Sequence, residues 1–161
     1  MPIDTQRLLA DFDAAAKDLG LPGWPSHYRA EALPAPHRSS PLPQGFGAVY
    51  IFGLSEQARC EAGAGRVLKV GRVGANSNAR FQSQHYSATA AGSTLARSLL
   101  KYRVLWPWLG IDHLDKSTVR TWMLANLDRV NLYVPSSSAD LLPHLEMYVR
   151  ARVGSVFEGS A

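Results

Sequence analysis

The chain has 161 residues, which is enough for one compact core and too few for two comfortable domains. Its 46% hydrophobic residues exclude a chain that stays disordered, and its net charge of +4 favours an anionic partner such as nucleic acid. The lone Cys60 cannot form an internal disulfide, and no run approaches the roughly 20 apolar residues of a membrane span, so we expect a cytoplasmic protein without membrane contact.

The first predicted element is an amphipathic helix. It begins after Asp4, a suitable N-cap, and its apolar residues recur at helical spacing until Gly20 and Pro22 end the pattern. Leu33 to Gln44 contains several prolines among serines and should run extended over the surface as a connector. Residues 1–44 therefore form an N-terminal extension to a main domain of residues 45–161. The helix could dock onto a partner, but packing on the main domain is favoured.

Three strands are predicted in the main domain. Phe46–Phe52 and Arg66–Val70 are rich in β-branched and aromatic residues and are bounded by glycines. An antiparallel hairpin with a long loop is the simplest way to pair them, because antiparallel neighbours need no crossover. Arg129–Val134 alternates in character and predicts the third strand.

Helices follow the hairpin and the third strand. Asn76 or Ser77 can cap a helix that runs through Gln84, and the small and polar residues 88–94 interrupt it before a second apolar stretch. Ala139–Val153 also has helical spacing. The order predicts an α/β sandwich, in which helices flank a small, mainly antiparallel sheet of three strands.

The hairpin carries two short motifs. Ala48-Val49-Tyr50 lies on the first strand and Lys69-Val70-Gly71 on the second, and this pair resembles the two tripeptides of the GIY-YIG nucleases. Tyr50 matches the tyrosine that ends the first family tripeptide, and Gly71 matches the glycine that ends the second. Lys69 stands where the family usually has another tyrosine. Alternation places Lys69 opposite Leu68 and Val70, on the face that Tyr50 must share.

The resemblance extends to residues beyond the hairpin. Arg80, on the helix expected after the hairpin, matches the family arginine, and Glu146, on the last helix, matches the metal-binding glutamate. The family often has a histidine or tyrosine one turn after the arginine, which makes His85 a catalytic candidate and Tyr86 the alternative. Phe157-Glu158-Gly159 resembles the closing segment of some members, where a polar residue supports the site.

These residue types suit hydrolysis of a phosphodiester by a metal-assisted reaction. Tyr50 could act as general base or position the attacking water, and the charge of Lys69 would lower the pKa of a neighbouring phenol. Arg80 offers a planar fork of donors to two phosphate oxygens. Glu146 could hold one Mg²⁺ or Mn²⁺, which needs few protein ligands because it keeps several waters.

Basic and amide side chains cluster after the second predicted strand. Those expected to contact the substrate backbone are Arg72, Asn76, Asn78, Arg97 and Lys101. Arg97 and Lys101 would lie on one charged face of an amphipathic helix, and simple solvent exposure of that face is an equal alternative.

The sequence thus predicts a Mg²⁺-dependent or Mn²⁺-dependent endonuclease that acts on DNA, with specificity from a homodimer or a partner protein. The resemblance implies direct attack of water on phosphorus and products with a 5′-phosphate. The alternative is a catalytically inactive domain of this fold that binds nucleic acid or a partner protein, as the lysine at 69 and the displaced histidine would suit. A third interpretation takes Gly71-Arg72-Val73-Gly74 as the backbone clamp of an RNA-binding module.

Overall fold

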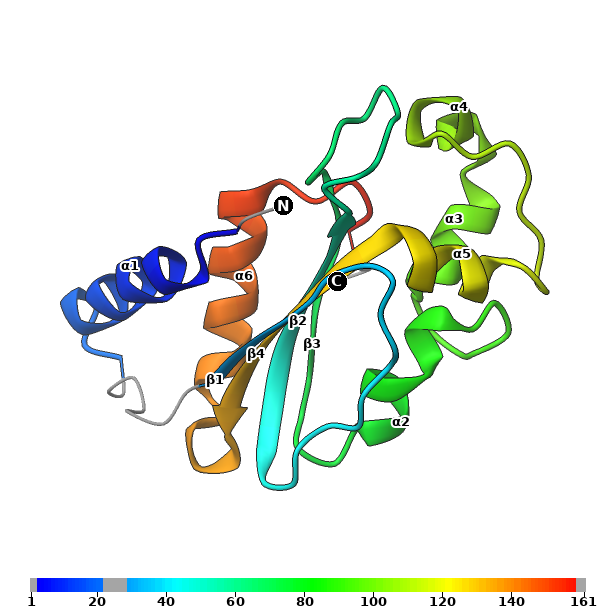
Figure 1. The fold of residues 1–161 in the computed structure, drawn as a ribbon. Helices are drawn as coiled ribbons and strands as arrows, with labels where there is room; N and C mark the ends of the chain where they lie inside the picture. The colour runs from blue at the N-terminus through cyan, green and yellow to red at the C-terminus, as the bar shows by residue number, and fades with distance from the viewer. Residues whose placement is uncertain (1–2, 22–28, 159–161) are drawn as a thin grey trace.

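The computed structural model describes residues 3–21 and 29–158 (Figure 1). Pro22, expected to end the first helix, and Gly159, part of the closing motif, lie outside these ranges. Four strands form one antiparallel sheet in the order β1-β4-β2-β3. The strands are β1 (Arg29–Leu33), β2 (Phe46–Leu54), β3 (Val67–Val73) and β4 (Leu127–Pro135). The predicted α/β architecture with an antiparallel sheet is confirmed, and β3 is one edge of that sheet.

The prediction of three strands was wrong, because β1 adds a fourth. β1 pairs with β4 along its whole length, from Arg29 opposite Tyr133 to Leu33 opposite Arg129. Its sequence, RAEAL, has no β-branched or aromatic residue and therefore carries no local strand signal. The free backbone edge of β4 supplies the pairing that the residues of β1 do not predict.

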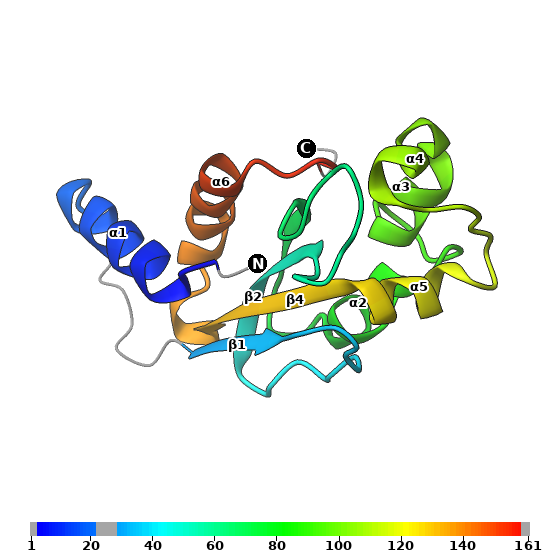
Figure 2. The same ribbon diagram turned by 45° about the horizontal axis from the view of Figure 1, so that its top comes forward.

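Helices cover both faces of the sheet, and the two groups are well separated in the rotated view (Figure 2). One face packs against α1 (Thr5–Asp18) and α6 (Leu141–Val153). The other face packs against a larger group of short helices. These are α2 (Asn78–Gln82), the 3₁₀ turn η1 (Gln84–Tyr86), α3 (Leu95–Lys101), α4 (Trp106–Leu109) and α5 (Val119–Asn126). The residue pattern did not predict α4 or α5.

The N-terminal helix packs on the main domain, as favoured from the sequence. The carboxylate of Asp4 caps α1 by accepting a hydrogen bond from the backbone N–H of Arg7 at 2.9 Å. Leu9 and Phe12 of α1 belong to the same buried cluster as residues of α6 and the sheet. The ion pair between Asp11 and Arg152 adds a contact at the surface. No helix within the described ranges has the length and apolar content needed to cross a bilayer.

A register shift in the β2–β3 hairpin changes one detail of the predicted faces. Tyr50 pairs with Gly71 and Phe52 with Lys69, but the next pair is Gly53 with Val67, so Leu68 is an extra residue. Lys69 therefore shares the face of Tyr50, as predicted. Leu68 was expected on the opposite face, yet the bulge brings it into the same core cluster as Tyr50.

Candidate functional site

A cavity of about 400 Å³ opens at the edge strand β3 and gathers four of the five residues predicted to be catalytic. Its polar lining comes from β2, β3, α2, α6 and the loop before α3. The lining side chains with polar groups are Tyr50, Lys69, Arg72, Arg80, Ser93, Glu146 and Arg150. Helices from both faces of the sheet thus contribute to one cavity, because β3 has no further strand outside it.

Gly71 allows Tyr50 to reach this cavity. The two residues face each other across the β2–β3 ladder. A Cβ atom on residue 71 would lie 2.5 Å from Cζ of Tyr50 and closer still to its hydroxyl oxygen. The tyrosine ring therefore lies across the Gly71 backbone, and its hydroxyl extends toward the sheet edge. Any side chain at position 71 would occupy the space that the ring needs.

The amino group of Lys69 is buried and lines the same cavity. Only 2% of the residue is exposed, and its Nζ donates a hydrogen bond to Oγ of Ser93 at 3.0 Å. Burial lowers the pKa of Lys69, and the charges of Arg80 and Arg150 lower it further, while Glu146 opposes the change. Ser93 was not among the predicted site residues, because it lies in a small, polar loop without any motif.

Tyr50 is protonated at neutral pH. Burial raises the pKa of its phenol to about 12, against the charge of Arg80 and a hydrogen bond with that residue. The expectation that Lys69 lowers the pKa of Tyr50 needs correction: the cations that act on the phenol are Arg80 and Arg129. As a protonated phenol, Tyr50 can orient a water molecule by hydrogen bonding, but it cannot accept the proton of that water as a phenolate base would.

Glu146 provides the carboxylate of the cavity. It is half-buried on α6, and its Oε2 accepts a hydrogen bond from Nε of Arg72 at 2.8 Å. Arg72, which was predicted to contact substrate, pairs with this carboxylate in the structure. Among the described residues, no three His, Cys, Asp or Glu side chains come together as a metal site. A metal ion at Glu146 would have a single carboxylate ligand among the residues that line the cavity.

His85 does not line the cavity, in contrast to its predicted catalytic place. It is fully buried, with its ring centroid 4.4 Å from that of Tyr50, and neither ring nitrogen has a hydrogen-bond partner. Burial lowers the pKa of His85 to about 3, and the nearby positive charge of Arg129 is the next largest cause of this shift. The ring is therefore neutral. The physical reason is that α2 ends at Gln82 and continues as a 3₁₀ turn, which directs His85 behind the tyrosine.

A buried arginine that sequence reasoning missed holds α2 in position. Arg129 is fully buried, and its guanidinium donates to the carbonyl of Phe81 at 2.9 Å and to the hydroxyl of Tyr86 at 3.2 Å. It also donates to Oδ1 of Asn131 at 2.9 Å. These bonds fasten α2 and η1 to β4, and α2 carries Arg80. Tyr86, the alternative to His85, is thus part of this buried network and outside the cavity lining.

The polar alternation of β4 was the available signal for this network. Arg129, Asn131 and Tyr133 are two residues apart and therefore share one face of the strand. Alternation is usually a sign of one solvated face. Here α2 and η1 cover the polar face. Glu31 of the neighbouring strand β1 accepts hydrogen bonds from both Asn131 and Tyr133.

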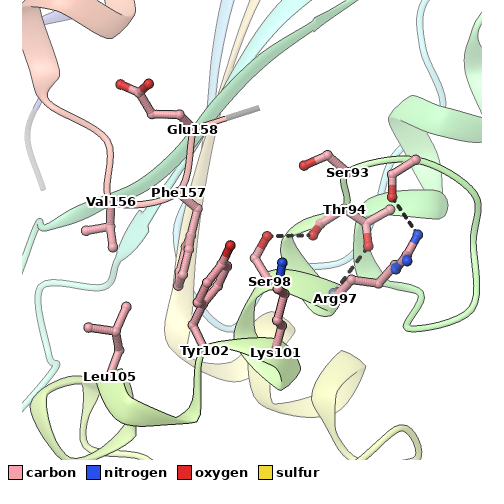
Figure 3. Close-up of a pocket in the computed structure, with 11 residues that line it drawn as sticks. Ser93, Thr94, Arg97, Ser98, Lys101, Tyr102, Leu105, Val156, Phe157 and Glu158 are labelled. Carbon is pink, nitrogen blue, oxygen red and sulfur yellow. Dashed lines mark hydrogen bonds between the residues drawn. The ribbon is translucent and has the colours of Figure 1, made fainter. Parts of the chain in front are cut away.

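The other residues predicted to bind nucleic acid lie in three different places in the structure. Asn76 is exposed in the turn between β3 and α2. Asn78 accepts a hydrogen bond from the backbone of Leu42 at 2.8 Å and so fastens the proline-rich connector. Arg97 and Lys101 line a second, larger cavity beside the first (Figure 3). Glu158 also lines this second cavity and pairs with Arg150 at 3.3 Å, which is its link to the candidate site.

No family model, curated protein or solved structure matched the chain. The functional interpretation therefore depends on the residues of the cavity and on their geometry.

Proposed function

We propose that this protein is a metal-dependent endonuclease that hydrolyses phosphodiester bonds in DNA and resembles the GIY-YIG nucleases. The observation that carries the proposal is the convergence of a tyrosine, a lysine, an arginine and a glutamate from four separate elements around one cavity. Each of these types suits a different task in phosphoryl chemistry. Their order in the chain was the basis of the resemblance, and their common cavity is an independent support.

The charge of the cavity suits a phosphate. Four of its lining side chains are basic, namely Lys69, Arg72, Arg80 and Arg150, and Glu146 opposes them. In a partly buried site these charges attract an anion more strongly than they would in water. Arg80 can present two parallel donors to two phosphate oxygens, so it is our candidate for binding the scissile group.

Glu146 fits a hard divalent cation such as Mg²⁺ or Mn²⁺. Such ions prefer oxygen ligands and retain several waters, so one carboxylate oxygen beside a substrate phosphate is an adequate anchor. When bound, the ion would supply Lewis-acid stabilisation of the negative charge that develops on phosphorus. The four neighbouring cations disfavour a metal ion in the absence of substrate, and a bound phosphate would offset them.

The remaining steps belong to the side chains of this chain. The hydroxyl oxygen of Tyr50 accepts a hydrogen bond from the attacking water. This bond orients the water so that a lone pair of the water oxygen is directed at phosphorus. Lys69, held by Ser93, places a positive charge beside the phosphate. A bond forms between the water oxygen and phosphorus while the bond to the leaving sugar oxygen breaks; the attacking water loses its proton to solvent, and the leaving oxygen takes a proton from solvent. Arg80 stabilises the extra charge of the transition state.

The test compares the parent with Glu146→Gln on supercoiled plasmid, linear duplex and single-stranded DNA, with Mg²⁺ or Mn²⁺ and with chelator. We expect metal-dependent nicking by the parent and its loss in Glu146→Gln. Glu61→Gln is the matched control, because Glu61 is exposed in the β2–β3 loop and should leave cleavage unchanged. Equal cleavage by Glu146→Gln would refute the proposal. DNA binding by both proteins without cleavage would favour the inactive binding domain instead.

A further inference from the structure

The second cavity adjoins the candidate site. It measures about 890 Å³ and lies between α3 and the C-terminal segment Val156–Glu158 (Figure 3). Gly92 and Ser93 line both cavities, and Ser93 is the residue that accepts the hydrogen bond from Lys69. A bound polymer that leaves the candidate site across Gly92 and Ser93 would therefore enter the second cavity directly.

One wall of the second cavity is an aromatic pair with an accessible member. The rings of Tyr102 and Phe157 are stacked, with centroids 5.9 Å apart and 25° between their planes. Phe157 is buried, whereas 44% of Tyr102 is exposed. Tyr102 lies between Phe157 and Lys101, whose Nζ is 4.9 Å from the tyrosine ring centroid (Figure 3). A flexible lysine is easily displaced by a flat group that stacks on the ring.

The cations of this cavity are placed along the same path. Arg97 donates a hydrogen bond from Nη1 to the carbonyl of Gly92 at 3.0 Å, so its guanidinium is held at the boundary between the cavities. Lys101 lies one turn further along α3, on the same side of the helix. The carboxylate of Glu158 also lines the cavity, but Arg150 offsets its charge. The cavity therefore has a net positive charge beside an aromatic wall, which suits a polyanion that carries flat groups.

We propose that the second cavity binds an unpaired DNA strand that continues from the phosphate at the candidate site, which makes this inference dependent on the proposed endonuclease function. A base of that strand stacks on Tyr102, and the flanking phosphates meet Arg97 and Lys101. The strand must be unpaired, because bases within a duplex are stacked on one another and offer no free face to a side chain. The preferred substrate is therefore DNA with a single-stranded segment beside the scissile bond.

The test measures binding of a fluorescent single-stranded oligothymidylate by anisotropy, in chelator, so that it needs no catalysis. We expect Tyr102→Ala to weaken binding about 10-fold, the loss of one base stack, and Tyr102→Phe to stay within about twofold of the parent. Arg97→Ala should reduce the slope of log affinity against log salt by about 0.7. Val104→Ala is the control, because Val104 is exposed nearby and does not line the cavity.

The outcomes separate this inference from the proposed function. If the parent fails to bind the oligonucleotide, or Tyr102→Ala binds as tightly as the parent while both have the same melting temperature, the inference is overturned, even where plasmid is cleaved. If Tyr102→Ala loses affinity for the single strand but keeps its affinity for a duplex, the inference is supported. Absence of cleavage with any metal, alongside such binding, would overturn the endonuclease proposal and the idea of a scissile bond, and would leave the second cavity as the strand-binding surface of a domain that does not cut.

Discussion

Replacement of Gly71 by alanine tests the central geometry of the site, the passage of Tyr50 over β3. Gly71 does not adopt a positive φ, so the effect of a methyl group is steric. That methyl would lie 2.5 Å from Cζ and 2.9 Å from Cε2 of Tyr50, well inside the usual carbon contact of about 3.5–4.0 Å. Tyr50 as a whole is 1% exposed, so its ring cannot move aside without losing its packing. Overpacking of this kind should lower the free energy of unfolding by about 1–3 kcal/mol.

A double-mutant cycle identifies the cause of that loss. Urea denaturation would be measured for the parent, Gly71→Ala, Tyr50→Ala and the double variant. Without the Tyr50 ring, alanine at position 71 should be neutral or stabilise by about 0.5–1 kcal/mol, because glycine is a poor strand residue. Gly74→Ala serves as control, since no atom lies within 4 Å of a Cβ at that position. If Gly71→Ala costs the same with and without Tyr50, the ring does not lie over β3 and the described cavity is refuted.

Two further predictions concern buried groups behind the cavity. The unfolded chain protonates His85 near pH 6.5, whereas the folded pKa is about 3, so stability is lost as pH falls below 6.5. Relative to His85→Phe, the parent should lose about 2 kcal/mol of unfolding free energy between pH 7 and pH 5 in urea titrations. If the unfolding free energies of the parent and of His85→Phe changed in parallel with pH, this prediction would be wrong. Arg129→Ala leaves Phe81, Tyr86 and Asn131 without their donor and should cost about 3–5 kcal/mol, against less than about 0.5 kcal/mol for the exposed Arg59→Ala. A loss below about 1 kcal/mol in the same assay would show that the network contributes little.

The convergence of Tyr50, Lys69, Arg80 and Glu146 could be anticipated from the chain. Alternation along a paired hairpin determines which residues share a face, and this placed Tyr50 and Lys69 together. The bulge at Leu68 did not disturb the pair, because it lies beyond Lys69. The placement of Arg80 and Glu146 came from motif order, and the edge position of β3 is what lets helices from both faces reach them.

His85 and Asn78 have positions and contacts that the residue pattern did not predict. A histidine five residues after Arg80 would have a definite direction on a regular helix, but the change to a 3₁₀ turn after Gln82 alters it. Asn78 looked suited to a phosphate. The connector runs past α2, however, and the backbone N–H of Leu42 donates a hydrogen bond to the amide oxygen of Asn78. Neither outcome depends on nearby residues alone.

The sequence by itself determined the strands β2, β3 and β4, the helices α1 and α6, and the common face of Tyr50 and Lys69. These features follow from the period of the residue pattern, which is a local property of the chain. Only the tertiary structure decided that β1 joins the sheet, that Arg129 is buried, and that Ser93 joins two cavities. Each of these depends on which distant segment covers or pairs with a given residue, and that partner is chosen by the packing of the whole domain.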